Sequence, residues 1–94
     1  MEKAIKSGDL VKAISGRDAE NYFVVIEVKQ DRALIVDGRT RKINYPKRKN
    51  VKHLKKVLSE EFLDFLLKIQ KGEPVSNKKL QREIKIAKQK IQED

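Results

Sequence analysis

The stretch that decides the fold is YFVVIEVKQDRALIV, residues 22–36. Residues 22–28 are aromatic or β-branched apart from one glutamate, a composition that favours a pleated, buried strand. Gln30 and Asp31 are typical of a tight turn, after which residues 32–36 form a returning strand. Tyr22 and Phe23 are neighbours in the first strand, so they should point to opposite faces, one into the core and the other outward or under a helix. The stretch predicts an antiparallel hairpin.

Shorter strands are expected on either side of this hairpin. One is predicted at residues 9–14, separated from the hairpin by a loop of turn-forming residues at 15–21. After the hairpin, Asp37-Gly38 is a strong turn signal, because glycine readily adopts the positive φ that such turns need. A fourth strand is predicted at residues 40–45, ended by the proline that follows, and a fifth at residues 51–57. Short strands at this spacing predict a small twisted barrel.

The periodicity becomes helical at Ser59. A first helix is expected there, with Ser59 as its N-cap, Glu60 and Glu61 in its first turn, and Gly72 after its end. A second helix is expected from residue 76 or 77. Its apolar residues form a heptad-like seam that should pack on the first helix, on the barrel or on a partner: Leu80, Ile84, Ala87 and Ile91. We therefore expect a barrel over residues 1–58 and a C-terminal helical segment over residues 59–94.

The charge of the chain is concentrated in one segment. Residues 38–59 contain nine Lys or Arg and no Asp or Glu, whereas the rest of the chain holds 14 basic and 14 acidic residues. The formal net charge of +9 is therefore the charge of this segment. A balanced body with one basic block suggests a polyanionic partner. A solvated surface is the plainer alternative, but nine like charges repel one another and lower the stability of the compact state.

Many side chains of this segment are candidates for contacts with nucleic acid. Arginines can grip a phosphate with two hydrogen bonds or stack on a base, and lysines act as compact charges. Residues 46–50 are expected to form a loop that projects three cations together. Tyr45 could stack on an unpaired base or lie at the barrel surface with its hydroxyl in water, and His53 could be structural or contact a phosphate. The candidates are Arg39, Arg41, Lys42, Tyr45, Lys47, Arg48, Lys49, Lys52, His53, Lys55 and Lys56.

Two stretches of the first half carry a resemblance to a known family. Residues 8–28, GDLVKAISGRDAENYFVVIEV, resemble the KOW motif, in which a strand opening Gly-Asp-x-Val leads through a glycine-bearing loop into an apolar strand. Residues 29–38, KQDRALIVDG, resemble the segment after the motif in a KOW-containing large-subunit ribosomal protein family of archaea and eukaryotes. Short bacterial KOW-domain RNA-binding proteins are similar from Gly8 to about Leu54. The residues that match the motif are Gly8, Asp9, Val11 and Gly16.

The resemblance implies an SH3-like barrel that binds ribosomal or other structured RNA, and association with the ribosome. It alone favours RNA over DNA, since composition does not separate the two. It also adds Arg17, in the loop after Gly16, to the candidate RNA-binding residues. The loop differs from many KOW loops because Asp18 and Glu20 follow Arg17. Asp18 is expected to fix Arg17 within a turn.

Other classes of function find less support. The chain has no cysteine, which removes disulfides, thiolate chemistry and the usual zinc sites. Without a nucleophile or metal cluster we expect no enzyme, no cofactor and no small-molecule substrate. The lack of an apolar run of ~20 residues, or of a signal peptide, predicts a cytoplasmic protein without membrane contact. The alternatives are a protein-interaction module that docks a peptide or helix, with the apolar seam as its contact, and a KOW factor associated with a transcription complex.

Overall fold

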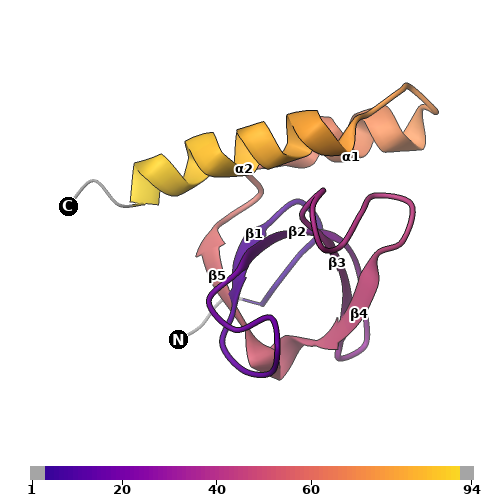
Figure 1. Cartoon of the computed structure of the whole chain (residues 1–94). Coiled ribbons are helices and arrows are strands. Elements are labelled where there is room, and N and C mark those ends of the chain that lie inside the picture. The colour runs from indigo at the N-terminus through magenta and orange to yellow at the C-terminus, as the bar shows by residue number, and fades with distance from the viewer. Residues whose placement is uncertain (1–3, 92–94) are drawn as a thin grey trace.

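The computed structural model describes residues 4–91, which form a five-stranded antiparallel sheet followed by two helices (Figure 1). The strand order across the sheet is β4-β3-β2-β1-β5. The elements are β1 (Leu10–Ala13), β2 (Tyr22–Lys29), β3 (Arg32–Val36), β4 (Lys47–Asn50), the 3₁₀ turn η1 (Val51–His53), β5 (Leu54–Leu58), α1 (Leu63–Gln70) and α2 (Asn77–Ile91). Neither helix is long and apolar enough to cross a membrane within the described range.

The predicted hairpin is confirmed and lies at the centre of the sheet. β2 and β3 pair in antiparallel register, from Val24 opposite Val36 to Lys29 opposite Arg32. Gln30, in the turn between them, has a φ of 56°, within the left-handed region that tight hairpin turns use. β1 pairs with the free side of β2, and β4 with the free side of β3.

The sheet is strongly curved but open. In Figure 1 the strands bend around a common interior, with β4 and β5 on opposite sides of it. These two strands are the edges of the sheet, and they are joined through η1 rather than paired with each other. The sequence predicted a small twisted barrel, and the structure has a curved, open sheet of five strands.

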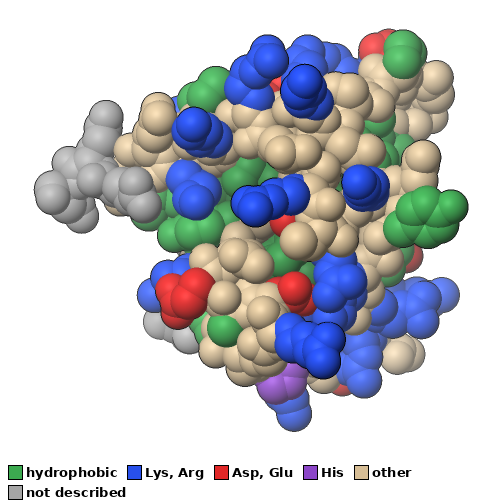
Figure 2. Space-filling view, viewed as in Figure 1, with side chains coloured by type: hydrophobic (Ala, Val, Ile, Leu, Met, Phe, Trp, Pro, Cys, Tyr) green, Lys and Arg blue, Asp and Glu red, His purple; other side chains and the backbone are tan. Residues whose placement is uncertain are grey.

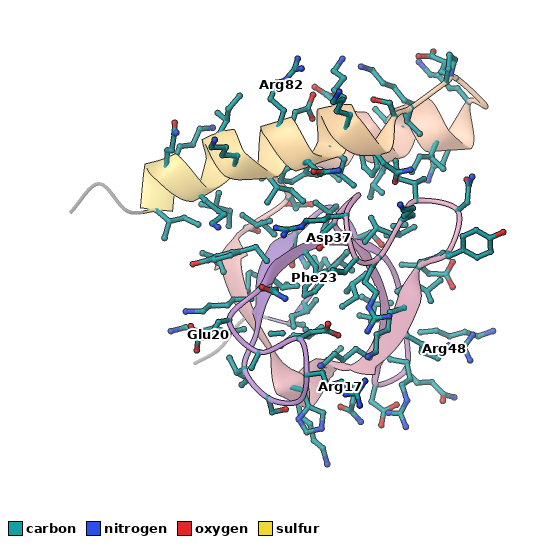
Figure 3. The ribbon with its side chains drawn as sticks, in the orientation of Figure 1. Arg17, Glu20, Phe23, Asp37, Arg48 and Arg82 are labelled. Atoms are coloured by element: carbon teal, nitrogen blue, oxygen red, sulfur yellow. The ribbon has the colours of Figure 1, made fainter. Side chains whose placement is uncertain are left out.

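Both faces of the sheet are apolar at its centre, because successive apolar side chains of β1, β2 and β3 lie on opposite faces and join two hydrophobic clusters. The inner cluster contains Val11, Ala13, Phe23, Val25, Ala33, Ile35 and Leu54. The outer cluster joins Leu10, Val24 and Val36 of the sheet to Phe62, Phe65, Leu66, Leu80, Ile84 and Ala87. The expected split of Tyr22 and Phe23 is confirmed: Phe23 is fully buried inside the curve (Figure 3), and the Tyr22 ring packs against the outer cluster.

The apolar seam of α2 packs on the sheet. Leu80, Ile84 and Ala87 are buried in the outer cluster, and Ile91 packs against it. Of the three expected positions for the seam, the structure has two together, because the same cluster contains strand residues and Phe65 and Leu66 of α1. The helical segment and the strands therefore share one core.

The predicted strand at residues 40–45 is wrong. Residues 37–46 form a loop in which the Asp37 carboxylate accepts hydrogen bonds from the backbone N–H groups of Arg39 (2.9 Å) and Arg41 (2.8 Å). An aspartate that bonds the backbone just after itself favours a turn over a strand. The chain becomes extended after Pro46, so the residues expected to form a projecting loop are strand β4 instead.

This loop is fixed to the start of α2. The side-chain oxygen of Asn77 accepts the N–H of Ile43 (2.8 Å), and Gln81 donates to the carbonyl oxygen of Gly38 (2.7 Å). Gly38 has a φ of 80°, and a Cβ atom added there would collide with the backbone carbonyl of Asn77. Only glycine fits this close approach of loop and helix without strain.

The predicted start of the first helix is also wrong. α1 begins at Leu63 rather than Ser59, and Asp64 is the acidic residue of its first turn in place of Glu60 and Glu61. The Glu60 N–H donates to the Asp9 carboxylate (2.7 Å), and Glu60 has a φ of 53° that breaks helical geometry. Asp9 lies 51 residues earlier in the sequence, so local periodicity does not reveal this contact. The predicted start of the second helix is confirmed, and the Ser76 hydroxyl accepts the N–H of Lys79 (3.0 Å).

Candidate nucleic-acid interface

The basic segment, residues 38–59, runs along several parts of the sheet. Its cations lie in the 37–46 loop (Arg39, Arg41, Lys42), on β4 (Lys47, Arg48, Lys49), in η1 (Lys52) and on β5 (Lys55, Lys56). β4 and β5 form the two opposite edges of the sheet. Continuity in sequence therefore does not by itself bring these side chains together, and their tertiary contacts decide which of them share a surface.

The loop between β1 and β2 gathers part of the segment. The Ser15 carbonyl oxygen accepts a hydrogen bond from Lys49 Nζ (3.0 Å), and the Ser15 hydroxyl is hydrogen-bonded to His53 Nδ1 (2.7 Å). Ser15 therefore links the loop to both β4 and η1. Asp18 of the same loop forms an ion pair with Lys47 of β4. Arg17 is exposed in the same loop, so it lies beside the basic segment.

Asp18 lies among the cations of the segment. Its side chain is only 8% exposed, and Oδ2 lies 3.2 Å from both Arg41 Nη2 and Lys47 Nζ. The expectation that Asp18 fixes Arg17 is therefore wrong, because its partners come from the 37–46 loop and from β4. Burial alone would raise the pKa of the Asp18 carboxyl, but hydrogen bonds from Lys47 and Arg41, with their positive charges, lower the pKa below its ordinary value. Asp18 stays ionised and holds these two cations in place.

Asp18→Asn should change how stability depends on pH. Because the pKa of Asp18 is lower in the folded state, its contribution is present above the unfolded-state value of about 3.9 and is lost as pH falls through the folded pKa. We expect the variant to be less stable at neutral pH by about 1–3 kcal/mol, since it loses hydrogen bonds between charged groups. Its free energy of unfolding should then fall less steeply than that of the wild type as the solution becomes acidic.

Urea unfolding at a series of pH values checks this. Glu20→Gln is the control, because Glu20 is an exposed carboxylate whose ion pair with Lys12 (2.9 Å) lies at the surface. Parallel curves for wild type and Asp18→Asn in the acidic range would mean that Asp18 does not stabilise the fold as described.

Six candidate cations are exposed, and their side chains form no ion pair or hydrogen bond within residues 4–91. They are Arg17, Arg39, Lys42, Arg48, Lys52 and Lys55. Figure 3 shows Arg17 and Arg48 directed away from the sheet into solvent. In Figure 2, Lys and Arg side chains gather at the lower right, over β4, with few acidic side chains between them, and the histidine lies at the lower edge. These six can meet an external anion without first breaking an internal contact.

Lys56 is held inside the protein. Its Nζ lies 3.2 Å from the fully buried Asp9 carboxylate and donates to the Ala4 carbonyl oxygen (2.6 Å). The Lys56 side chain is 14% exposed. We therefore assign it to the fold and leave it out of the interface, although the sequence proposed it as an RNA contact.

The two ring side chains of the segment differ in environment. Tyr45 is 80% exposed, and its ring belongs to neither hydrophobic cluster. An aromatic ring held free of the core beside Lys42 and Pro46 can stack on an unpaired base. His53 is half-buried and bonded to Ser15, which gives it a structural role in linking η1 to the 15–21 loop.

Within residues 4–91 no three His, Asp or Glu side chains are grouped so as to hold a metal ion. Comparisons of the chain with protein-family models and with curated proteins find no match.

Proposed function

We propose that this protein binds structured RNA through the phosphates, using the exposed cations of the basic segment and of the neighbouring 15–21 loop. The observation that carries the proposal is that Arg17, Arg39, Lys42, Arg48, Lys52 and Lys55 are all exposed and have no side-chain partner among residues 4–91. The KOW resemblance of residues 8–38 supports an SH3-like type of domain and implies ribosomal RNA as the target. The proposal assigns no catalytic step to the protein.

The physical basis of binding is the release of condensed counterions when cations neutralise phosphates. The folded domain favours binding, because the backbone positions from which these side chains extend are already set before RNA arrives. Asp18 contributes by fixing Arg41 and Lys47 and by reducing the repulsion among the cations around it. Phosphate contacts carry no sequence information, so we expect shape and phosphate spacing to decide where the protein binds, with Tyr45 available for one unpaired base.

The salt dependence of wild-type binding tests this function. Each neutralised phosphate contributes about 0.7 to 0.9 to the slope of log affinity against log salt concentration, so six contacts predict a slope of about −4 to −5. Fluorescence anisotropy with a labelled RNA hairpin, repeated over a range of salt concentrations, measures it. A slope near zero, or no binding at low salt, would contradict the proposal.

The helix-docking form of the protein-interaction alternative loses the residues on which it depended. Leu80 and Ile84 lie almost fully buried on the face of α2 that packs in the core. Replacing both by Asp would bury two unpaired carboxylates, so we expect that variant to unfold rather than to lose a partner selectively. RNA binding is therefore the function that the exposed side chains support better.

A further inference from the structure

The helix α2 is strongly basic, although the residues outside the basic segment carry equal numbers of acidic and basic side chains. It contains six Lys or Arg and a single acid, Glu83, at residues 77–91. Its apolar seam faces the sheet, so its charged residues lie on its two sides and on its outer surface. The six cations are Lys78, Lys79, Arg82, Lys85, Lys88 and Lys90.

One side of α2 is taken up by contacts with α1. Lys79 and Glu83 line a groove shared with α1, and Lys90 forms an ion pair with Glu61 (2.7 Å). Two acidic side chains also border this groove: Asp64 in the first turn of α1 and Glu61 just before the helix. The positive charge on this side therefore has counter-charges nearby.

The other side of α2 faces the 37–46 loop. Gln81 and Asn77 bind this loop, and Lys88 Nζ lies 4.9 Å from the centre of the Tyr22 ring. At 3.6 residues per turn, Lys78, Arg82 and Lys85 lie between this side and the outer surface of the helix. All three are exposed, and none has a side-chain partner among the described residues. Figure 3 shows Arg82 directed away from the sheet.

These three cations repel one another. Lys78 and Arg82 are four residues apart, and Arg82 and Lys85 are three apart, which are the spacings at which like charges destabilise a helix. The first turn of α2 contains no acid, although acids are favoured at that end of a helix. An external polyanion would remove this repulsion.

The three cations also continue the proposed interface. Because Asn77 and Gln81 fix the 37–46 loop to α2, Arg39 and Lys42 lie at set positions beside the helix. Figure 2 views the molecule with α2 in front of α1, and Lys and Arg side chains extend on this side from the helix at the top to the region of β4 at the lower right. Acidic side chains on this face are few.

We infer that the α2 face, defined as Lys78, Arg82 and Lys85, is a second phosphate-binding surface and forms one continuous track with Arg39 and Lys42. The inference rests on the proposed RNA binding and extends its footprint. It assigns to α2 a role in binding as well as in the core: the seam anchors the helix, and the opposite surface holds the RNA backbone.

The test compares two double variants of equal charge change, measured against the same labelled RNA hairpin. Arg82→Glu with Lys85→Glu alters the α2 face, and Lys68→Glu with Lys71→Glu alters the α1 region. In about 0.15 M salt each phosphate contact contributes roughly four- to fivefold to affinity, so losing two should weaken binding by at least about 15-fold and reduce the salt slope by about two. The control should change affinity by less than about threefold, because distant charges are screened over about 8 Å.

The outcomes separate this inference from the proposed function. A loss no greater than that of the control, with wild-type binding still steeply dependent on salt, would overturn the α2 inference alone. Wild-type binding without that salt dependence would overturn both. Circular dichroism checks that the variants fold, and Arg82→Gln with Lys85→Gln, which removes charge without reversing it, should also weaken binding by about 15-fold.

Discussion

Replacing Arg39, Lys42 and Arg48 together by Glu is expected to weaken binding to an RNA hairpin by about 60- to 125-fold in about 0.15 M salt. This range is the loss of three phosphate contacts, each worth roughly four- to fivefold at that salt concentration, and charge reversal should add to it. The slope of log affinity against log salt concentration should become shallower by about two to three units. Anisotropy titrations at several salt concentrations give both quantities.

The choice of these three positions follows from the structure. Lys47 and Lys49, which the sequence alone would select, are bound to Asp18 and to the Ser15 carbonyl, so reversing them would disturb the fold as well as any interface. Arg39, Lys42 and Arg48 are exposed and have no side-chain partner in the described part of the chain. Substitutions at such positions usually change stability by less than about 0.5 kcal/mol.

The matched control reverses Lys68, Lys71 and Lys79, which lie on the α1 side of the molecule. It makes the same change in net charge away from the proposed interface. If both triple variants lost affinity equally, binding would depend on overall charge and not on this surface.

Asp9→Ala is expected to lower the free energy of unfolding by about 3–5 kcal/mol. Asp9 is fully buried, and its carboxylate accepts the backbone N–H groups of Lys6 and Glu60, each at 2.7 Å. Lys56 Nζ lies 3.2 Å away. Removing the carboxylate leaves an almost buried ammonium group and two amides without their acceptor, at the point where β1, β5 and the start of α1 meet.

Thermal and urea unfolding, followed by circular dichroism, measure this effect. For a domain of this size each kcal/mol corresponds to roughly 4–8 °C in melting temperature, so a fall of at least about 12 °C is expected. Glu27→Ala, at an exposed position of β2, is the control and should have little effect. Asp9→Ala with Lys56→Met should recover part of the loss, because it also removes the uncompensated charge. Equal melting temperatures for Asp9→Ala and Glu27→Ala would contradict the role given to Asp9.

Local pattern was sufficient to predict the elements whose side chains alternate regularly. The β2–β3 hairpin, the strand before it and the start of α2 agree with the periodicity, because each buries an apolar face with the expected period of two or of about 3.6. The errors in predicted secondary structure lie where an aspartate carboxylate accepts hydrogen bonds from backbone N–H groups. Asp37 makes residues 37–46 a loop, and Asp9 holds the N–H of Glu60, so that α1 begins later than its composition suggests.

The candidate site was predictable in charge but not in contacts. The basic segment is evident from composition, yet Asp18 meets Arg41 across 23 residues of sequence and Lys47 across 29, and no local signal marks those pairs. The residues outside the basic segment include 14 acids and 14 bases, and this balanced count does not reveal that α2 is basic. That count combines the acids around α1 with the cations of α2, and only the tertiary structure shows that Lys78, Arg82 and Lys85 lie away from the side of α2 that meets those acids.

The most direct test of the interface is lysine footprinting with and without the RNA hairpin, using an acetylating reagent and mass spectrometry. We expect RNA to protect Lys42 and Lys52 of the basic segment, and Lys85 if the α2 face also binds. Lys68 and Lys71 near α1 should react at unchanged rates. Protection of Lys68 and Lys71 with unchanged reactivity at Lys42 and Lys52 would contradict the assignment of RNA binding to the basic segment.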